Sequence, residues 1–322
     1  MTTRLKLLVN SDDSNSFWHP AFSPFMSRYF DIVRFGDDTV HNKKDTVLAV
    51  NVFKTGNPDA SYWYRPYHEQ GFKVIVDALW EYEGFHLEQP GEYTTPQWPE
   101  TDGFFLAHIK NWFWYFESLW YTQLGYQHSR PNKTYAKLAL MPMRVDRWHR
   151  KETFARMSSM LDDMIWSYVK HGKYLPNDTS VDQAHFQRHY DPSWYDSTCY
   201  SLVTETMVDT PPDIFVTEKT FKPMAFYHPF MCVAQQGHLA YLKSQGFETF
   251  ENMFDESYDL MPLLDDRIQH IVAQSKSFKK EPYSQVTWDK LAHNHDRFYN
   301  QQIVESRLVK ELIEPILEYA ES

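Results

Sequence analysis

The hydrophobic positions of this chain fall into short apolar runs separated by longer amphipathic or polar stretches. Four early runs are rich in aliphatic or β-branched residues and end at polar ones, which is typical of β-strands. A second series is almost entirely apolar, as expected for strands buried on both faces of a parallel sheet. The expected strands are 5–9, 46–50, 73–76 and 104–107 in the first series and 137–141, 200–204, 214–216 and 230–234 in the second.

Helical patterns lie between and after these runs. From 149 to 170, large apolar residues recur at three- and four-residue spacing, which predicts one long amphipathic helix that Gly172 ends. A short helix is expected in HLAYLKSQGF, with Gly246 near its C-cap. The C-terminal VESRLVKELIEPILEYA predicts a helix kinked at Pro315. This alternation of strands and helices predicts an α/β protein.

The length of 322 residues favours two domains. The polar, proline-containing segment GYQHSRPNKT separates the two strand series and is the best linker candidate. We therefore expect an N-terminal Rossmann-like domain at 1–130 and a C-terminal domain at 131–322 that includes the C-terminal helices. Because ligands of open α/β sheets bind beyond the carboxyl ends of the strands, the binding residues are sought there.

Composition narrows the function classes. The formal net charge of -11 argues against indiscriminate nucleic-acid binding, which depends on neutralising phosphates. No stretch approaches the ~18 uncharged apolar residues of a membrane span, and the N-terminus enters a strand-like run without the pattern of a signal peptide. We therefore expect no membrane span and a cytoplasmic location. Cys199 and Cys232 lie in apolar surroundings, which argues against disulfides or a cysteine zinc site.

One basic cluster follows the run at 214–216, in FVTEKTFKPMAFYHPF. Proline fits best in the first turn of a helix, so Pro223 predicts a helix that starts no earlier than about Lys219. Thr217 and Glu218 then lie in the connecting turn. Lys219 and a second lysine, Lys222, would face the positive end of the helix dipole, which is unfavourable unless an anion binds. The alternative is a solvated Glu218–Lys222 ion pair, worth only ~0–1 kcal/mol.

A second basic cluster occurs in LALMPMRVDRWHRKET, where a strand is expected to lead into the long helix. Arg144, Arg147 and Arg150 follow the carboxyl end of this strand, and guanidinium groups bind phosphate well. Two cationic strand-exit loops in one domain of an acidic chain predict a shared diphosphate ligand.

The segment SLVTET, followed by IFVTEKTFKPMAFYHPFMCVAQQGHLAYLKSQGFETF, resembles the donor-binding half of the alpha-1,3-fucosyltransferase-like glycosyltransferases, which include bacterial and phage relatives. The resemblance implies a GT-B fold, with two facing Rossmann-like domains and a nucleotide-sugar in the cleft. It also implies an inverting, metal-independent transfer without a cofactor other than the nucleotide-sugar co-substrate. The donor-binding residues that it implies are Arg144, Arg147, Arg150, Glu205, Thr217, Glu218, Lys219 and Lys222.

Within that set, the resemblance assigns the diphosphate to Lys219, hydroxyl groups of the sugar or ribose to Glu218, and a supporting role to Glu205. The chain departs from the family at two places. Thr206 and Met207 stand where the family commonly has Asn-Ser, and His228 stands where a glycine is usual. The donor sugar therefore stays open.

In the N-terminal half, KVIVDALWEYEGF is similar to the family's strand that leads to an aromatic-glutamate pair, which makes Glu81 the candidate general base. Such a base must reach the acceptor hydroxyl within ~2.6–3.2 Å. The alternative is that Glu81 and Glu83 are ordinary solvated loop residues. Asp77 and His19 are further candidates.

The acceptor and a metal site are the remaining questions. His185 and His189 have a ligand-like spacing but no matched carboxylate, so no metal is expected. The acceptor is a glycan or another hydroxyl compound, with a hydroxylated base of phage DNA as the alternative. The expected location is the cytoplasm of a bacterial cell or of a phage-infected host. A non-catalytic nucleotide- or glycan-binding protein is the competing hypothesis.

Overall fold

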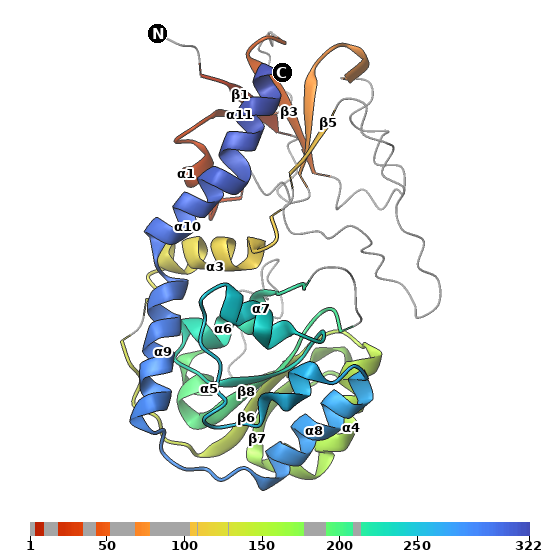
Figure 1. Ribbon diagram of the computed structural model, residues 1–322, viewed down its shortest axis with the longest axis vertical. Coiled ribbons are helices and arrows are strands. Elements are labelled where there is room, and N and C mark those ends of the chain that lie inside the picture. Colours follow the sequence, from red (N-terminus) through yellow and green to blue (C-terminus); the bar gives the residue numbers. More distant parts are fainter. Residues whose placement is uncertain are drawn as a thin grey trace. The chain divides into compact units, whose positions relative to one another are not determined.

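The computed structural model divides the chain into two compact units. The first comprises Met1–Leu124 and Gln301–Ser322, and the second comprises Gly125–Asn300 (Figure 1). Each unit contains its own parallel sheet with helices, so the predicted α/β class is confirmed and is consistent with a GT-B-like fold. The structure describes residues 4–9, 19–34, 43–51, 68–77, 104–107, 109–127, 129–176, 191–208 and 214–322. No helix among these residues is long and apolar enough to cross a membrane.

The first unit is built on a five-stranded sheet with the order β2-β1-β3-β4-β5. Its strands are β1 (Lys6–Val9), β2 (Asp31–Arg34), β3 (Thr46–Asn51), β4 (Lys73–Asp77) and β5 (Phe104–Ala107). Its helices before the second unit are α1 (Ser23–Met26) and α3 (Trp112–Gln123). All four strands predicted here are confirmed to within one residue. The pattern missed β2, whose sequence DIVR has only two apolar residues between charged ends and pairs with β1 from its first residue.

The C-terminal helices complete the first unit. They are α10 (Gln301–Leu308), a π-helical turn (Val309–Ile313) and α11 (Glu314–Glu321). Leu308, Leu312 and Ile316 are fully buried, and the Lys73 ammonium of β4 donates to the backbone oxygens of Tyr319 and Ala320 at 2.8 and 2.9 Å. We expected residues 301–322 in the second domain, but this burial and these bonds join them to the first sheet.

The expected disturbance at Pro315 is present. The π-helical turn ends at Ile313, and Pro315 lies in the first turn of α11. Because proline has no N–H, it cannot bond to the carbonyl of Glu311 in an α-helical pattern. The π-turn therefore lies directly before the residue that cannot continue the α-helical hydrogen-bond pattern.

The second unit is built on a four-stranded parallel sheet with the order β7-β6-β8-β9. Its strands are β6 (Lys137–Met143), β7 (Met164–Tyr168), β8 (Thr198–Thr204) and β9 (Phe230–Val233). Its helices are α4 (Trp148–Met157), α5 (Pro192–Ser197), α6 (Glu218–Ala225), α7 (His238–Ser244), α8 (Leu264–Ser277) and α9 (Gln285–Phe298). Three of the four strands predicted here are confirmed, and α7 confirms the short helix before Gly246.

Two predictions for the second unit were wrong. The stretch 149–170 is not one helix: α4 ends at Met157, a 3-10 segment follows, and β7 pairs with β6 from Met164 onward. The sequence MIWSY of β7 suits a strand, and pairing with β6 outweighs the helical spacing. The run 214–216 is not a strand, because Phe215 donates its backbone N–H to the Gln235 side chain at 2.7 Å instead of to a neighbouring strand.

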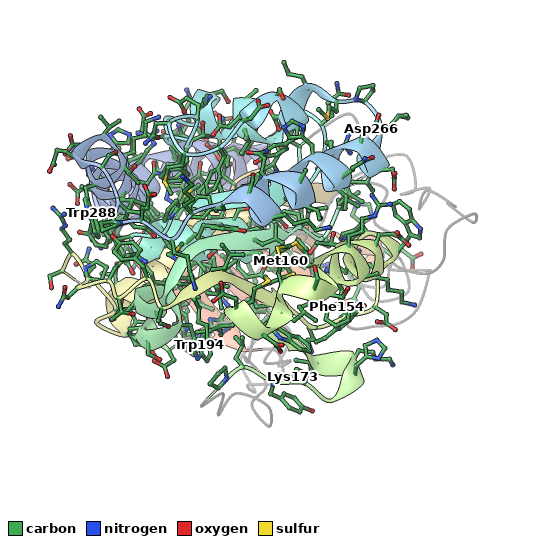
Figure 2. The ribbon with its side chains drawn as sticks, turned by 90° about the horizontal axis from the view of Figure 1, so that it is seen from below. Phe154, Met160, Lys173, Trp194, Asp266 and Trp288 are labelled. Atoms are coloured by element: carbon green, nitrogen blue, oxygen red, sulfur yellow. The ribbon has the colours of Figure 1, made fainter. Side chains whose placement is uncertain are left out.

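The two faces of β8 have different surroundings. Tyr200 packs edge-on against Phe254 and Phe278, with ring centroids 5.3 and 5.1 Å apart. The next residue, Ser201, points to the opposite face, where the unit has a pocket. Helices α4 and α8 lie side by side, and Phe154 of α4 packs against Trp166 of β7 (Figure 2). The aromatic core thus packs against one face of β8, and the pocket lies against the other face, near the carboxyl ends of the strands.

We expect Leu312→Ala to destabilise the first unit by ~2–5 kcal/mol, because it removes a fully buried side chain and leaves a cavity. Leu317→Ala is the matched control, since Leu317 is 38% exposed and lies further along the same C-terminal segment. Urea unfolding followed by circular dichroism measures both. Equal effects of the two substitutions would contradict the packing of the C-terminal helices described above.

Candidate functional site

A pocket of about 870 Å³, counting its space open to solvent, lies at the carboxyl ends of β6 and β8. Its walls are mainly apolar side chains of the sheet and of α5. Trp194, from α5, donates its indole N–H to the carbonyl of Pro176 at 2.7 Å, which fixes the orientation of the ring (Figure 2). The apolar lining residues are Leu140, Pro142, Met143, Val169, Leu175, Trp194, Tyr195, Val203 and Pro223.

The polar lining of the pocket is concentrated where β6 and α6 meet it. Arg144 follows β6, and Glu218, Lys219 and Lys222 belong to α6. Three hydroxyl residues, Ser167, Ser201 and Thr204, complete the lining. The pocket thus combines an apolar interior with three cationic side chains and one carboxylate.

A threonine cap determines where α6 begins. Thr217 is the N-cap, and its hydroxyl accepts a hydrogen bond from the backbone N–H of Lys219 at 3.4 Å. The helix begins at Glu218, which is earlier than we predicted from Pro223. Pro223 is the sixth residue of this short helix, and the threonine cap supplies the start signal that the proline argument overlooked.

The Lys219 ammonium has three acceptors in the structure. It donates to Glu218 Oε1 at 2.8 Å and to the hydroxyl oxygens of Thr206 and Thr217, both at 3.1 Å. Its side chain is 25% exposed, so the ammonium is held in place but still accessible from the pocket. A lysine held in this way presents a fixed positive charge to an anion.

Glu218 is ionised because of its neighbours. Burial alone would raise the pKa of its carboxyl group, but the positive charges of Lys219 and Lys222, with the hydrogen bond from Lys219, lower it to about 2. The carboxylate therefore stays charged at neutral pH and is available as a hydrogen-bond acceptor beside the pocket.

Of the three arginines predicted as phosphate ligands, only Arg144 lines the pocket. Burial lowers the pKa of its guanidinium. Arg147 lies at the start of α4 and donates to the carbonyl oxygen of Thr206 at 2.8 Å. It therefore contacts the loop that leaves β8.

Arg150 and His149 bind the same loop. Arg150 is only 3% exposed and donates to the carbonyl oxygens of Thr204 and Glu205 at 3.2 and 3.4 Å. Burial and the charge of Arg147 lower the pKa of Arg150 to about 10. Burial and the nearby arginines lower the pKa of His149 to about 3, so the imidazole is neutral, and its Nε2 contacts the Glu205 carbonyl at 2.9 Å.

Glu205 follows β8 and is fully buried. Its carboxylate accepts hydrogen bonds from Thr217 and Thr220 of the α6 start, so it connects the two loops at this edge of the sheet. It does not line the pocket. The supporting role that the resemblance implies for Glu205 stays a prediction.

The site is locally cationic although the chain is acidic. Among the described residues, the pocket and the two loops beside it carry five positive charges, on Arg144, Arg147, Arg150, Lys219 and Lys222, and three negative ones, on Asp146, Glu205 and Glu218. Local excess charge of this kind raises the concentration of small anions at a pocket. The chemistry that fits is a phosphate-containing ligand with an apolar or aromatic part.

The remaining predicted residues either fall outside the described part of the chain or belong to the first unit. Glu81, Glu83, His185 and His189 are outside the described residues. Asp77 ends β4 in the first unit, and its side chain is not described. His19, also in the first unit, is buried against Phe116 and Trp120 and accepts the backbone N–H of Ala21 at 3.1 Å. Within the described ranges, no group of three or more potential metal ligands occurs.

Sequence reasoning missed several residues of the site. Trp194 and Tyr195 belong to the aromatic stretch DPSWYDST, whose composition was the available signal. Ser167 was missed because β7 was predicted as part of a helix. The sequence assigned no role to Thr206 or His149, because their contacts, to Lys219 and to the Glu205 carbonyl, join segments that are distant in sequence.

The comparisons with known proteins give only weak structural similarity. No family model and no curated protein matches the chain. A crystal structure of an alpha1,3-fucosyltransferase matches at 9% identity and a TM-score of 0.45, covering 95% of this chain and 89% of that one. An alpha1,3-fucosyltransferase with GDP-fucose matches at 11% identity and a TM-score of 0.41, covering 95% and 90%. TM-scores below 0.5 assign neither a fold family nor a function.

The lowered pKa of Glu218 predicts a pH-dependent contribution to stability. Because the folded pKa lies below the ordinary value of 4.5, the contribution is complete above pH 4.5 and is lost as the pH falls toward about 2. Relative to Glu218→Gln, we expect the wild type to lose ~2 kcal/mol of unfolding free energy between pH 7 and pH 3. Urea unfolding of both proteins at each pH measures this difference, and parallel curves would contradict the assigned charge environment.

Proposed function

We propose that the pocket of the second unit binds the nucleoside diphosphate part of a nucleotide-sugar, and that the chain is an inverting glycosyltransferase. The observation that carries the proposal is the pocket itself, with its aromatic and apolar walls and with Arg144, Lys219 and Lys222 at the ends of parallel strands. A nucleobase and ribose suit the apolar part, and the diphosphate suits the cationic part. Glu218 is proposed to accept hydroxyl groups of the ribose or the sugar.

In the proposed reaction, the acceptor oxygen forms a bond to the anomeric carbon of the sugar. The bond from that carbon to the phosphate oxygen breaks, and its electron pair leaves with the diphosphate. A carboxylate base takes the acceptor proton, and Glu81 is the proposed base. Fixed cations stabilise the negative charge that develops on the diphosphate, which is the electrostatic role often assigned to a metal ion. We therefore propose that the transfer does not require a metal.

A glycan or another hydroxyl compound is the proposed acceptor, with a hydroxylated DNA base as the alternative. The competing proposal of a non-catalytic binding protein is tested by incubating the protein with a panel of nucleotide-sugars and no acceptor. Slow release of free nucleotide supports a transferase, whereas tight binding without release supports the binding protein.

We expect Lys219→Ala to weaken the affinity for nucleoside diphosphates by about tenfold or more, since the variant loses a charged hydrogen-bond donor at the pocket. Calorimetry with GDP, UDP and ADP measures the affinity. Lys276→Ala is the matched control, because Lys276 is exposed on α8 and does not line the pocket. Unchanged affinity in a folded Lys219→Ala protein would remove the central claim.

We expect Glu81→Gln to lower turnover by ~10²–10⁴ while donor affinity stays nearly unchanged, because glutamine keeps the size of the side chain but cannot accept the proton. Both quantities are measured on one purified variant, with EDTA present in every reaction, so turnover of the wild type in the same buffer also tests independence from metals. Near-wild-type transfer by Glu81→Gln would move the role of base to Asp77, Glu83 or His19.

A further inference from the structure

The carboxylate of Glu205 is surrounded by hydrogen-bond donors. Its Oε1 accepts from the backbone N–H of Thr217 at 3.1 Å and from the hydroxyl of Thr220 at 2.7 Å. Its Oε2 accepts from the hydroxyl of Thr217 at 2.6 Å and from the backbone N–H of Thr206 at 3.0 Å. The residue has no exposed surface. Four donors therefore converge on one buried charge.

The charge of Glu205 determines the direction of these hydrogen bonds. An ionised carboxylate only accepts, so each threonine hydroxyl must use its single proton on Glu205. The lone pairs of Thr217 Oγ1 are then left for the Lys219 ammonium, 3.1 Å away. Likewise, Thr220 Oγ1 can accept from Nε2 of His238, 3.2 Å away, which places the imidazole proton on Nε2.

We infer that Glu205 is a positioning residue for the pocket: by making Thr217 an acceptor toward Lys219, it fixes the ammonium group at the edge of the pocket. The inference rests on the proposed function only in treating Lys219 as an anion ligand. Glu205 itself does not line the pocket, so it acts through Thr217. Fixed charges aligned before binding reduce the cost of ordering a site around a ligand.

Glutamine cannot replace Glu205 in this arrangement although it has the same shape. Each carboxylate oxygen accepts from one backbone N–H, of Thr217 or of Thr206. A backbone N–H cannot reverse its direction as a hydroxyl can, so the NH₂ group of the introduced amide would face a donor in either orientation. Glu205→Gln is thus a specific test of hydrogen-bond direction at nearly constant volume.

The first experiment reads the position of Lys219 without any ligand. Reductive methylation followed by mass spectrometry measures the reaction rate at Lys219, with Lys276 as the exposed reference. Thr217→Ser keeps the hydroxyl and is expected to react like the wild type, whereas Thr217→Val and Glu205→Gln are expected to react severalfold faster at Lys219 only. Wild-type rates in both of the latter variants, once their folding is confirmed by circular dichroism, would overturn the inference.

The second experiment measures binding of UDP, GDP and ADP to the same variants by calorimetry. We expect Glu205→Gln and Thr217→Val to lose about tenfold in affinity, and Thr217→Ser to stay close to the wild type. Full affinity in Glu205→Gln would also overturn the inference. If the wild type binds none of the three nucleotides, the proposed function fails, while the methylation rates still decide whether Glu205 positions Lys219. Should Glu205→Gln not fold, the methylation rate of Lys219 and the nucleotide affinity are compared between Thr217→Val and Thr217→Ser. Equal values in these two variants would then overturn the inference.

Discussion

The second unit depends on a buried negative charge at the edge of its sheet. A carboxylate without solvent contact is costly unless hydrogen bonds and opposite charges compensate it. Glu205 has four donors from two chain segments, which are the loop after β8 and the start of α6. These segments cannot separate without leaving the charge uncompensated. The same bonds therefore fold the loop and place Lys219 beside the pocket.

The cations of the site have two kinds of contact: some bond to the backbone of a loop, and others line the pocket. Arg147 and Arg150 donate to the backbone oxygens of 204–206, which parallel strand ends leave without partners in the sheet. They hold the loop that carries Glu205, and their charge offsets that of the carboxylate. Arg144 and Lys219 instead line the pocket. Arg147 and Arg150 thus support the loop, whereas Arg144 and Lys219 are the cations proposed to bind the ligand.

The sequence predicted those features that depend on local pattern. Seven of the eight predicted strands are present, because short apolar runs with polar ends are intrinsic to the chain. The prediction of one helix at 149–170 was wrong because the apolar spacing also fits a short helix followed by an edge strand. Pairing between β7 and β6 favours the helix and strand over the single helix. The domain assignment of residues 301–322 was wrong for a similar reason, since the residues that they contact lie far away in sequence.

At the candidate site, local pattern located the two basic loops but could not assign their side chains. Arg144, Arg147 and Arg150 have the same chemistry at three-residue spacing, so only the direction in which α4 leaves β6 separates the pocket ligand from the loop supports. Thr217 was predicted only as part of the connecting turn, although threonine is a typical N-cap residue, and Glu205 was assigned a supporting role by the resemblance alone. Their mutual bonds, however, become visible only when both loops meet.

The charge distribution also bears on the kind of ligand. A chain with a net charge of -11 repels a long polyanion on average, although its charges are unevenly distributed. At physiological ionic strength, however, charges are screened beyond ~8 Å, so a small diphosphate senses mainly the nearby side chains. Among the described residues that line the pocket, three side chains are cationic and one is anionic. This asymmetry suits the small anionic donor of the proposed function better than a long polyanion.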